Sequence, residues 1–356
     1  MQLALYPSSI GRSPLPPGLS WGEIQGHGRT PTLVRHVPNA YHLCSSDHPT
    51  WKWGRLDNDA DAHVPDRFVS SKASTTLVTP ISNRLRKRLG LSLRWGPRLP
   101  GWRERVVVLC YHSVHPSSTF PSSTSPKLFE RHMRWLSEEC DLIPFIRAWD
   151  ERSRPNRFRP AVAVTFDDGF ADNHTHALPT LLRYEIPATF FVTTGLIDRV
   201  GDVIQQRGWR GWSLEGSTLT WGQIIEMQRL GMEIGAHGHR HAILGRLDDE
   251  DVVSDLSMCK QILEERLEAS ISSIAYPKGR PRRDFSQRTT DLARTVGFEN
   301  GAAVLFRRVR HSDSRMAIAR FVVEEDSLDI LRAKVWGKMD VIGLLQERAP
   351  MRLLAE

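Results

Sequence analysis

Short apolar segments alternate with amphipathic segments along this chain from Arg105 onward. Val106–Tyr111 (VVVLCY) and Ala161–Phe166 (AVAVTF) are apolar at nearly every position, which is typical of parallel strands buried on both faces. Between them, Pro126–Glu139 places its apolar residues at helical spacing. This alternation predicts an α/β fold, in which helices cover a mostly parallel sheet.

The same pattern predicts the remaining elements of the domain. We expect strands over residues 188–193, 233–236 and 274–276, and helices over residues 177–184, 220–230, 248–268 and 284–296. The expected helix ends are Ser125 and Thr218 or Thr220 as N-caps, and Gly297 after the last helix. Polar residues follow several strands directly, and in such folds the ends of parallel strands gather on one face.

The N-terminal region differs from the domain in composition. Residues 1–80 are rich in Pro, Ser, Gly, His and Asp and have no sustained apolar period, so we predict a disordered leader. Residues 81–104 are predicted to be a basic linker. Within it, residues 83–98 could form a short amphipathic helix that touches a membrane surface, with a plain linker as the alternative. The folded domain is expected to span residues 105–345.

The net charge of +7 belongs to the N-terminal region. Residues 1–105 contain 15 Lys or Arg against 7 Asp or Glu, whereas the rest of the chain is nearly neutral. The basic region lacks the interleaved aromatic residues and the recognisable fold of a nucleic-acid reader, so we expect no nucleic-acid partner. The sequence leaves the oligomeric state open.

Two further features concern location and redox state. No segment reaches the roughly 18 apolar residues that a membrane-spanning helix requires, and the first residues show no signal-peptide pattern, which predicts a cytoplasmic protein without a transmembrane segment. The four cysteines are far apart and form no Cys-x-x-Cys pair, so we predict reduced thiols at Cys44, Cys110, Cys140 and Cys259.

Two adjacent acids follow the second strand, in the segment VTFDDG at residues 164–169. The glycine lets the chain turn away, so Asp167 and Asp168 can point in different directions. One carboxylate could then bind a cation while the other takes a proton from water. The alternative is a pair of acids that caps a helix.

A histidine cluster follows another short strand, in the segment AHGHRH at residues 236–241. His237 and His241 are four positions apart, so we expect them to meet on one helical face and, with one carboxylate, to form a three-ligand site of the zinc type. By the same geometry His239 points away and is interpreted as a surface or supporting residue. A histidine cluster on the surface is the alternative.

Two weaker signals concern substrate contacts. The segment IAYPKG, residues 274–279, ends a strand with Pro and Gly, so the turn at Tyr276 and Lys278 can offer backbone N–H groups to an oxyanion, although alone it is only a turn. Trp209, Trp212 and Trp221 could stack on sugar rings, and core packing is the alternative.

These segments together resemble the polysaccharide deacetylase family, the carbohydrate esterases with NodB homology. The family's first motif, Thr-Phe-Asp-Asp, and its second, His-[Ser/Thr]-x-x-His, are present in the family's order apart from one position. The segment LCYHSV at residues 109–114 is similar to the branch that opens with a Tyr-His strand, and IPATFFV at residues 186–192 continues that likeness. The resemblance covers residues 105–336.

The resemblance implies an irregular (β/α) barrel with fewer than eight strands and a site at the carboxyl ends of the strands. It assigns Asp167 as the general base and Asp168, His237 and His241 as ligands of a divalent cation, zinc first, with cobalt, nickel or manganese as alternatives. The turn at Lys278 would help to hold the oxyanion. The substrate would be an N-acetylated saccharide, from which metal-activated water releases acetate.

Some positions depart from the family pattern. The Ser or Thr after the first metal histidine is Gly238, and the arginine that usually holds the base is Ala275. Arg320 resembles the arginine of a late strand in this branch and is our candidate to orient Asp167, with a purely structural ion pair as the alternative. No Leu-x-His segment supplies a general acid, so that role is unassigned; His311 and His112 are the histidines considered for the site.

Three functions fit these residues. The first is a metal-dependent N-deacetylase, a hydrolase of non-peptide carbon–nitrogen bonds. The second is a carbohydrate-binding protein with a degenerate site, suggested by the missing arginine and late histidine. The third is a related hydrolase of an O-acetyl ester or a cyclic amide, because the chemistry at the carbonyl is shared.

Overall fold

The computed structural model describes residues 106–116, 122–153, 159–197 and 218–348. The predicted leader (1–80) and basic linker (81–104) lie outside these ranges, as do Trp209 and Trp212, and they stay predictions. Among the described residues, no helix combines the length and apolar character needed to cross a membrane. Cys110, Cys140 and Cys259 are free, buried thiols, as predicted.

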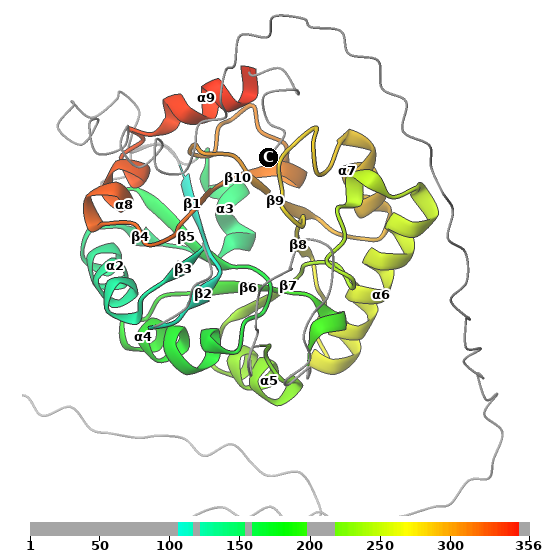
Figure 1. Ribbon diagram of the computed structural model, residues 1–356, viewed down its shortest axis with the longest axis horizontal. Coiled ribbons are helices and arrows are strands. Elements are labelled where there is room, and N and C mark those ends of the chain that lie inside the picture. Colours follow the sequence, from blue (N-terminus) through cyan, green and yellow to red (C-terminus); the bar gives the residue numbers. More distant parts are fainter. Residues whose placement is uncertain (1–105, 117–121, 154–158, 198–217, 349–356) are drawn as a thin grey trace, which may run out of the picture. The chain divides into compact units, whose positions relative to one another are not determined.

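The described strands form a closed parallel barrel (Figure 1). The ring contains β1 (Val106–Tyr111), β5 (Ala161–Phe166), β6 (Ala188–Val192), β7 (Glu233–Ala236), β8 (Ser273–Ala275), β9 (Asn300–Val304) and β10 (Ile318–Val322). β10 pairs with β1, and β1 pairs with β5 along its whole length, which closes the ring. Among the described residues the ring therefore has seven strands, so the predicted irregular barrel with fewer than eight strands is confirmed.

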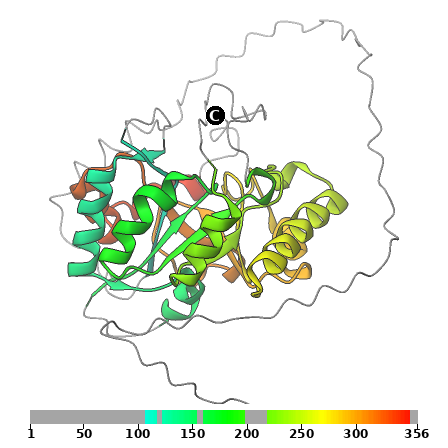
Figure 2. The same cartoon turned by 90° about the horizontal axis from the view of Figure 1, so that it is seen from below.

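Helices cover the outside of the barrel, as Figures 1 and 2 show from two directions. They are α2 (Pro126–Glu139), α4 (Leu178–Arg183), α5 (Trp221–Arg229), α6 (Asp249–Leu267), α7 (Gln287–Thr295), α8 (Leu328–Val335) and α9 (Asp340–Arg348). The short elements are β2 (Ser113–Val114), β3 (Ser123–Thr124), β4 (Asp141–Leu142), η1 (Phe145–Arg147), α3 (Ala148–Glu151), η2 (Asn173–Ala177), η3 (Thr194–Leu196), η4 (Leu244–Arg246) and η5 (Arg315–Ala317).

The predicted elements are present, with shifts at their ends. Thr220 caps α5 through a capping box with Gln223, as one of the two alternatives predicted. The predicted helix over residues 284–296 begins only after Ser286, because the Asp284 carboxylate is buried against Arg280. Ser125 occupies the N-cap position of α2, but its hydroxyl donates to Glu325 instead of bonding to the helix.

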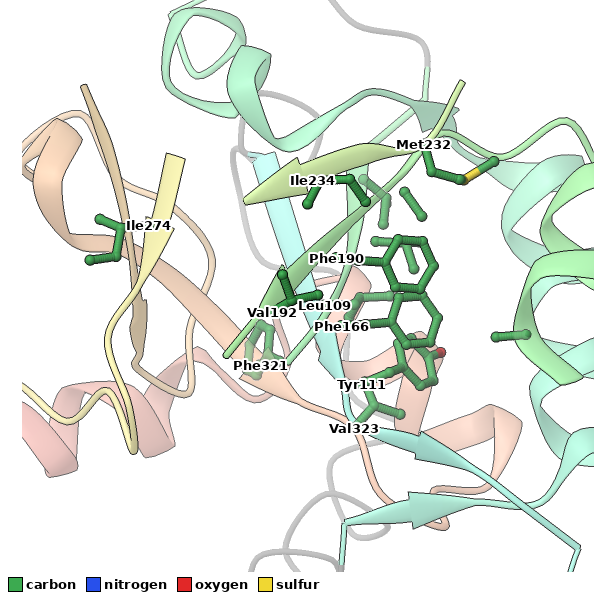
Figure 3. Close-up of a cluster of buried hydrophobic side chains, with 14 of the residues drawn as sticks. Leu109, Tyr111, Phe166, Phe190, Val192, Met232, Ile234, Ile274, Phe321 and Val323 are labelled. Carbon is green, nitrogen blue, oxygen red and sulfur yellow. The ribbon is translucent and has the colours of Figure 1, made fainter. Parts of the chain in front are cut away.

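Alternate residues of each strand face opposite sides of the barrel wall. Leu109, Tyr111, Phe166 and Phe190 belong to the large cluster between strands and helices, where Figure 3 shows the Phe166 ring lying between the other two aromatic rings. The Phe166 and Phe190 ring centroids are 4.6 Å apart. Their neighbours in sequence face the other way, and small residues such as Ala163 fill the barrel interior.

This alternation also places the polar residues. On β5, the inward row Ala161, Ala163 continues through Thr165 to Asp167, just past the strand. On β10, the inward row continues from Ile318 to Arg320. The interior is therefore apolar at the amino ends of the strands and polar at their carboxyl ends, which is where the site forms.

Candidate active site

The adjacent acids diverge because the backbone changes conformation between them. Asp167 continues the inward row of β5, and its N–H donates to the Tyr111 carbonyl at 3.0 Å. Asp168 has a φ of 76°, which side-chain-bearing residues seldom adopt, and Gly169 follows with a φ of 80°. The turn sends the two carboxylates to different partners.

Asp168 meets both predicted histidine ligands. Its Oδ1 lies 3.2 Å from His237 Nε2 and 3.1 Å from His241 Nε2, and all three side chains are buried. Two ligands about 2.1 Å from a tetrahedral ion are about 3.4 Å apart. The donor atoms therefore have the chemistry and the spacing that a single divalent cation requires.

The environment of His237 fixes which nitrogen carries the proton in its neutral ring. Its Nδ1 lies 2.7 Å from the Ala275 carbonyl oxygen, which can only accept a hydrogen bond. In the neutral ring Nδ1 must then carry the proton, which leaves the Nε2 lone pair for a shared cation. Burial lowers the pKa of His237, but the Asp167 and Asp168 carboxylates outweigh burial and raise it, so that without a cation Nε2 carries a proton and donates to Asp168. Ala275, where the family usually has an arginine, thus contributes through its backbone.

Asp167 is held by Arg320, whose side chain is fully buried inside the barrel. Nη1 donates to Oδ1 at 2.7 Å and Nη2 to Oδ2 at 2.8 Å, so the ion pair is bidentate. Nη1 also donates to Thr165 Oγ1 at 3.1 Å, while the Thr165 hydroxyl donates to the Leu109 carbonyl. The geometry fits the predicted orienting role of Arg320.

The surroundings keep both acids ionised at neutral pH. Burial raises the pKa of Asp167, but the Arg320 guanidinium and His237 outweigh burial and hold this pKa below its ordinary value. Burial also raises the pKa of Asp168, and hydrogen bonds from His237 and His241 outweigh it and hold the pKa well below the usual range. Burial lowers the pKa of His241, which favours the neutral imidazole that a metal ligand requires.

Known proteins of similar sequence belong to the polysaccharide deacetylases. Residues 155–301 match the polysaccharide deacetylase family. The predicted resemblance to this family is therefore confirmed over that part of the chain. The chain is 26% identical over 199 residues to the putative polysaccharide deacetylase YxkH of Bacillus subtilis (strain 168), a match that covers 55% of this chain and 63% of that protein. The relatives are named as deacetylases, which is the enzyme class predicted for this chain.

Longer matches agree with the family and the barrel. A poly-beta-1,6-N-acetyl-D-glucosamine N-deacetylase of Staphylococcus aureus (strain MSSA476) is 22% identical over 294 residues, covering 74% of this chain and 95% of that protein. The structure of IcaB from Ammonifex degensii has 27% identity and a TM-score of 0.55, covering 65% of this chain and 97% of that one. Streptococcus pyogenes deacetylase PplD, in complex with acetate, shares the fold, with 22% identity and a TM-score of 0.55 over 65% and 98% of the two chains.

The second family motif reaches its geometry without a helix. The prediction that His237 and His241 share a helical face is wrong, because this segment is a loop in which Gly238 has a φ of 74° and His241 a φ of 53°. Those two left-handed residues turn the chain so that the imidazoles converge, with ring centroids 5.0 Å apart. His239, which was interpreted as a surface or supporting residue, is partly exposed, and its Nδ1 lies 2.9 Å from Thr194 Oγ1.

Asp255 of α6 holds this loop and was missed by the sequence interpretation. Its buried carboxylate accepts hydrogen bonds from the backbone N–H groups of His239 at 2.9 Å and Arg240 at 3.0 Å, and from Arg240 Nε. A Cβ on Gly238 would lie 2.8 Å from Asp255 Oδ2, so the family's Ser or Thr does not fit here. The available signal was a charged residue next to Val252 and Leu256 on the apolar face of a helix.

His112 lies at the centre, as the Tyr-His resemblance suggested. His112, Cys110 and Asp167 have potential ligand atoms within 4.8 Å of one another. Burial lowers the pKa of His112, with both acids of the site acting against that effect. Cys110, which was interpreted only as a reduced thiol, lies with its Sγ 3.4 Å from Asp167 Oδ2. His311, in contrast, is exposed in the loop before η5.

The turn after β8 contains the two remaining residues predicted to contact the substrate, Tyr276 and Lys278, and they lie in different surroundings. The prediction for Tyr276 is wrong: its ring packs on Phe285 with centroids 4.2 Å apart in the outer core, and its N–H donates to the Ala302 carbonyl. The reason is strand alternation, because Ala275 faces inward and the next side chain must face outward. Lys278 is exposed, has a φ of 63° and lies close enough to disfavour the charged form of His241.

Proposed function

We propose that this chain is a divalent-metal-dependent hydrolase that removes N-acetyl groups from an N-acetylated sugar polymer or glycoconjugate. The observation that carries the proposal is a complete ligand set, Asp168, His237 and His241, beside a second carboxylate that the cation does not need. A purely structural cation has no use for Asp167. The relatives that act on poly-beta-1,6-N-acetyl-D-glucosamine support an N-acetylated glycan as the substrate class.

Asp168, His237 and His241 would hold the cation, and two imidazoles with one carboxylate suit zinc best, with cobalt, nickel or manganese as alternatives. When bound, the cation supplies Lewis-acid chemistry, polarising the acetyl carbonyl and raising the acidity of water. His112 and Lys278 lie near the ligand set and are the residues that we expect to contact the substrate.

Asp167 is the proposed general base. Its carboxylate takes a proton from the attacking water while the new C–O bond forms at the acetyl carbon. Arg320 keeps this carboxylate ionised and fixes the direction of both oxygens. The same carboxyl group can return the proton to the sugar nitrogen when the C–N bond breaks. The products are the free amine and acetic acid, which then ionises to acetate by releasing its proton to solvent, and no additional general acid is needed to balance the protons.

Acetate release from a panel of saccharides tests the function. We expect release from β-1,6-linked or β-1,4-linked N-acetylglucosamine oligomers by the zinc-loaded protein, none after chelation, and recovery when zinc returns. A fully de-N-acetylated oligomer serves as the control. Sugar binding without acetate release would instead indicate a binding protein, and release only from O-acetyl sugars would indicate an esterase.

A further inference from the structure

Two loops at the carboxyl ends of β7 and β8 carry an excess of positive charge. Residues 242–247 follow the ligand His241, and residues 278–285 follow β8. Together they contain one acid, Asp284, and five basic residues. We call the five the basic rim: Arg246, Lys278, Arg280, Arg282 and Arg283.

The two loops are fixed against each other. Gly245 N–H donates to the Asp284 carbonyl at 2.8 Å, and a Cβ on Gly245 would lie 2.9 Å from that same oxygen. Such a close approach of two backbones requires glycine. In the second loop, Arg282 N–H donates to the Phe285 carbonyl at 2.8 Å, and Arg282 adopts a φ of 66°. The rim is therefore a built surface rather than a set of independent side chains.

The one acid does not neutralise the rim. Asp284 is buried and pairs with Arg280 through contacts of 2.6 and 3.2 Å, while Arg283 Nε lies 3.9 Å from it. Within the part of the chain that the structure describes, Arg246 and Arg282 are exposed and have no ion-pair partner. Arg283 Nη1 is buried without a hydrogen-bond partner there.

Arg246, Arg280 and Arg283 are close enough to repel one another, and Lys278 lies near the ligand His241. Burial lowers the pKa of Arg283, and the nearby charges of Arg280 and Arg246 lower it further. Lys278 acts in the same way on His241. Like charges held together are unfavourable unless an anion joins them, and guanidinium groups bind carboxylates and phosphates through paired hydrogen bonds.

We propose that the basic rim binds a carboxylate or phosphate group on the glycan, so that the preferred substrate is an anionic N-acetylated saccharide. This inference rests on the proposed function, because it places the charged group next to the sugar whose acetamido group enters the metal centre. An oxyanion there would pair with the exposed guanidinium groups of Arg246 and Arg282.

Three tetrasaccharides test the inference by acetate release with the zinc-loaded full chain. One alternates glucuronic acid with N-acetylglucosamine, the second is chitotetraose 1-phosphate, and the third is neutral chitotetraose. We expect kcat/KM to be higher for at least one charged sugar than for the neutral sugar. In the double variant Arg246→Gln, Arg282→Gln, the charged-to-neutral ratio of kcat/KM should fall about tenfold, the scale of one charge-assisted hydrogen bond. The sugar that shows the preference identifies the anion.

Arg229→Gln is the matched control, because Arg229 is exposed at the end of α5, immediately before the amino end of β7. Its charged-to-neutral ratio should equal that of the wild type, and thermal unfolding should show that all variants are folded. Equal kcat/KM for all three sugars overturns the inference, and so does a charged-to-neutral ratio of kcat/KM that is unchanged in the double variant. A double variant that loses only its binding to phosphatidylglycerol vesicles, measured in parallel, also overturns the inference.

A binding measurement separates this inference from the proposed function. Calorimetric titration of Asp167→Asn with the glucuronate tetrasaccharide and the 1-phosphate reports the rim without turnover. Suppose that the charged sugar binds, that the double substitution abolishes this binding, and that the wild-type chain releases no acetate from any sugar. That combination would support the basic rim and contradict the deacetylase function. Acetate release from the neutral sugar, with no preference for the charged sugars, would support the deacetylase function and contradict the basic rim.

Discussion

At the scale of single residues, the ion pair between Asp167 and Arg320 decides the state of the proposed base. A buried carboxylate would favour its protonated form, yet the bidentate guanidinium holds the pKa of Asp167 below its usual range. The group is then ionised at every pH above that lowered pKa. Arg320 is accordingly a positioning residue that acts through Asp167.

Substitution of Arg320 by Gln should move the pH profile. Gln removes the charge but keeps a donor, so burial then dominates and the pKa of Asp167 rises. The acid limb of kcat/KM should shift to higher pH, and stability should fall by about 3 kcal/mol because a buried charge has lost its partner. Steady-state rates across pH and thermal unfolding measure the two effects.

Arg315 offers a control, since it lies five positions earlier, is partly exposed, and contacts Asn300 Oδ1 at 2.9 Å and Glu299 at 4.0 Å instead of Asp167. Arg315→Gln should leave the profile in place. An acid limb that is superimposable for Arg320→Gln and the wild type would show that this guanidinium does not set the state of the base.

At the scale of elements, α6 supports the metal-binding loop. Asp255 accepts the N–H groups of two consecutive loop residues, His239 and Arg240, which stand between the ligands His237 and His241. One buried carboxylate therefore fixes a turn that would otherwise leave two donors unsatisfied. Gly238 provides the space that this carboxylate occupies.

Asp255→Asn should weaken zinc binding by roughly tenfold to a hundredfold, the usual effect of losing a residue that orients metal ligands. The amide places a donor against the two loop N–H groups, so the turn loosens. Competition with a colorimetric chelator measures the affinity. Asp251→Asn, one turn earlier on α6 and half exposed, is the control and should bind zinc as the wild type does. Equal affinity in the Asp255 variant would exclude the supporting role.

The strands and the polar residues at their ends could be predicted from the sequence, because an apolar run and the acids that follow it lie within a few consecutive residues. Alternation along β8, applied one residue further, would have placed Tyr276 in the core. The loop between His237 and His241 was predicted as helix because the i, i+4 spacing is shared by helices and by this turn. Its support comes from Asp255, 15 residues from Arg240, and no local period reports such a contact.

At the scale of the whole molecule, barrel closure assembles the site. Arg320 is 153 residues from Asp167 in sequence, and the two meet because β10 returns to pair with β1 beside β5. The family resemblance supplied the barrel and the candidate arginine, whereas spacing alone could not have joined them. The basic rim likewise depends on two loops that only the parallel arrangement brings together.

The central claim is that one buried cation, held by Asp168, His237 and His241, works with a separate base, Asp167. The most direct measurement is zinc content and acetate release in Asp167→Asn and His237→Ala. Asp167→Asn should bind zinc at wild-type stoichiometry while its rate falls by at least about a hundredfold, and His237→Ala should lose the metal and the activity together. Undiminished acetate release by zinc-loaded Asp167→Asn would contradict the account.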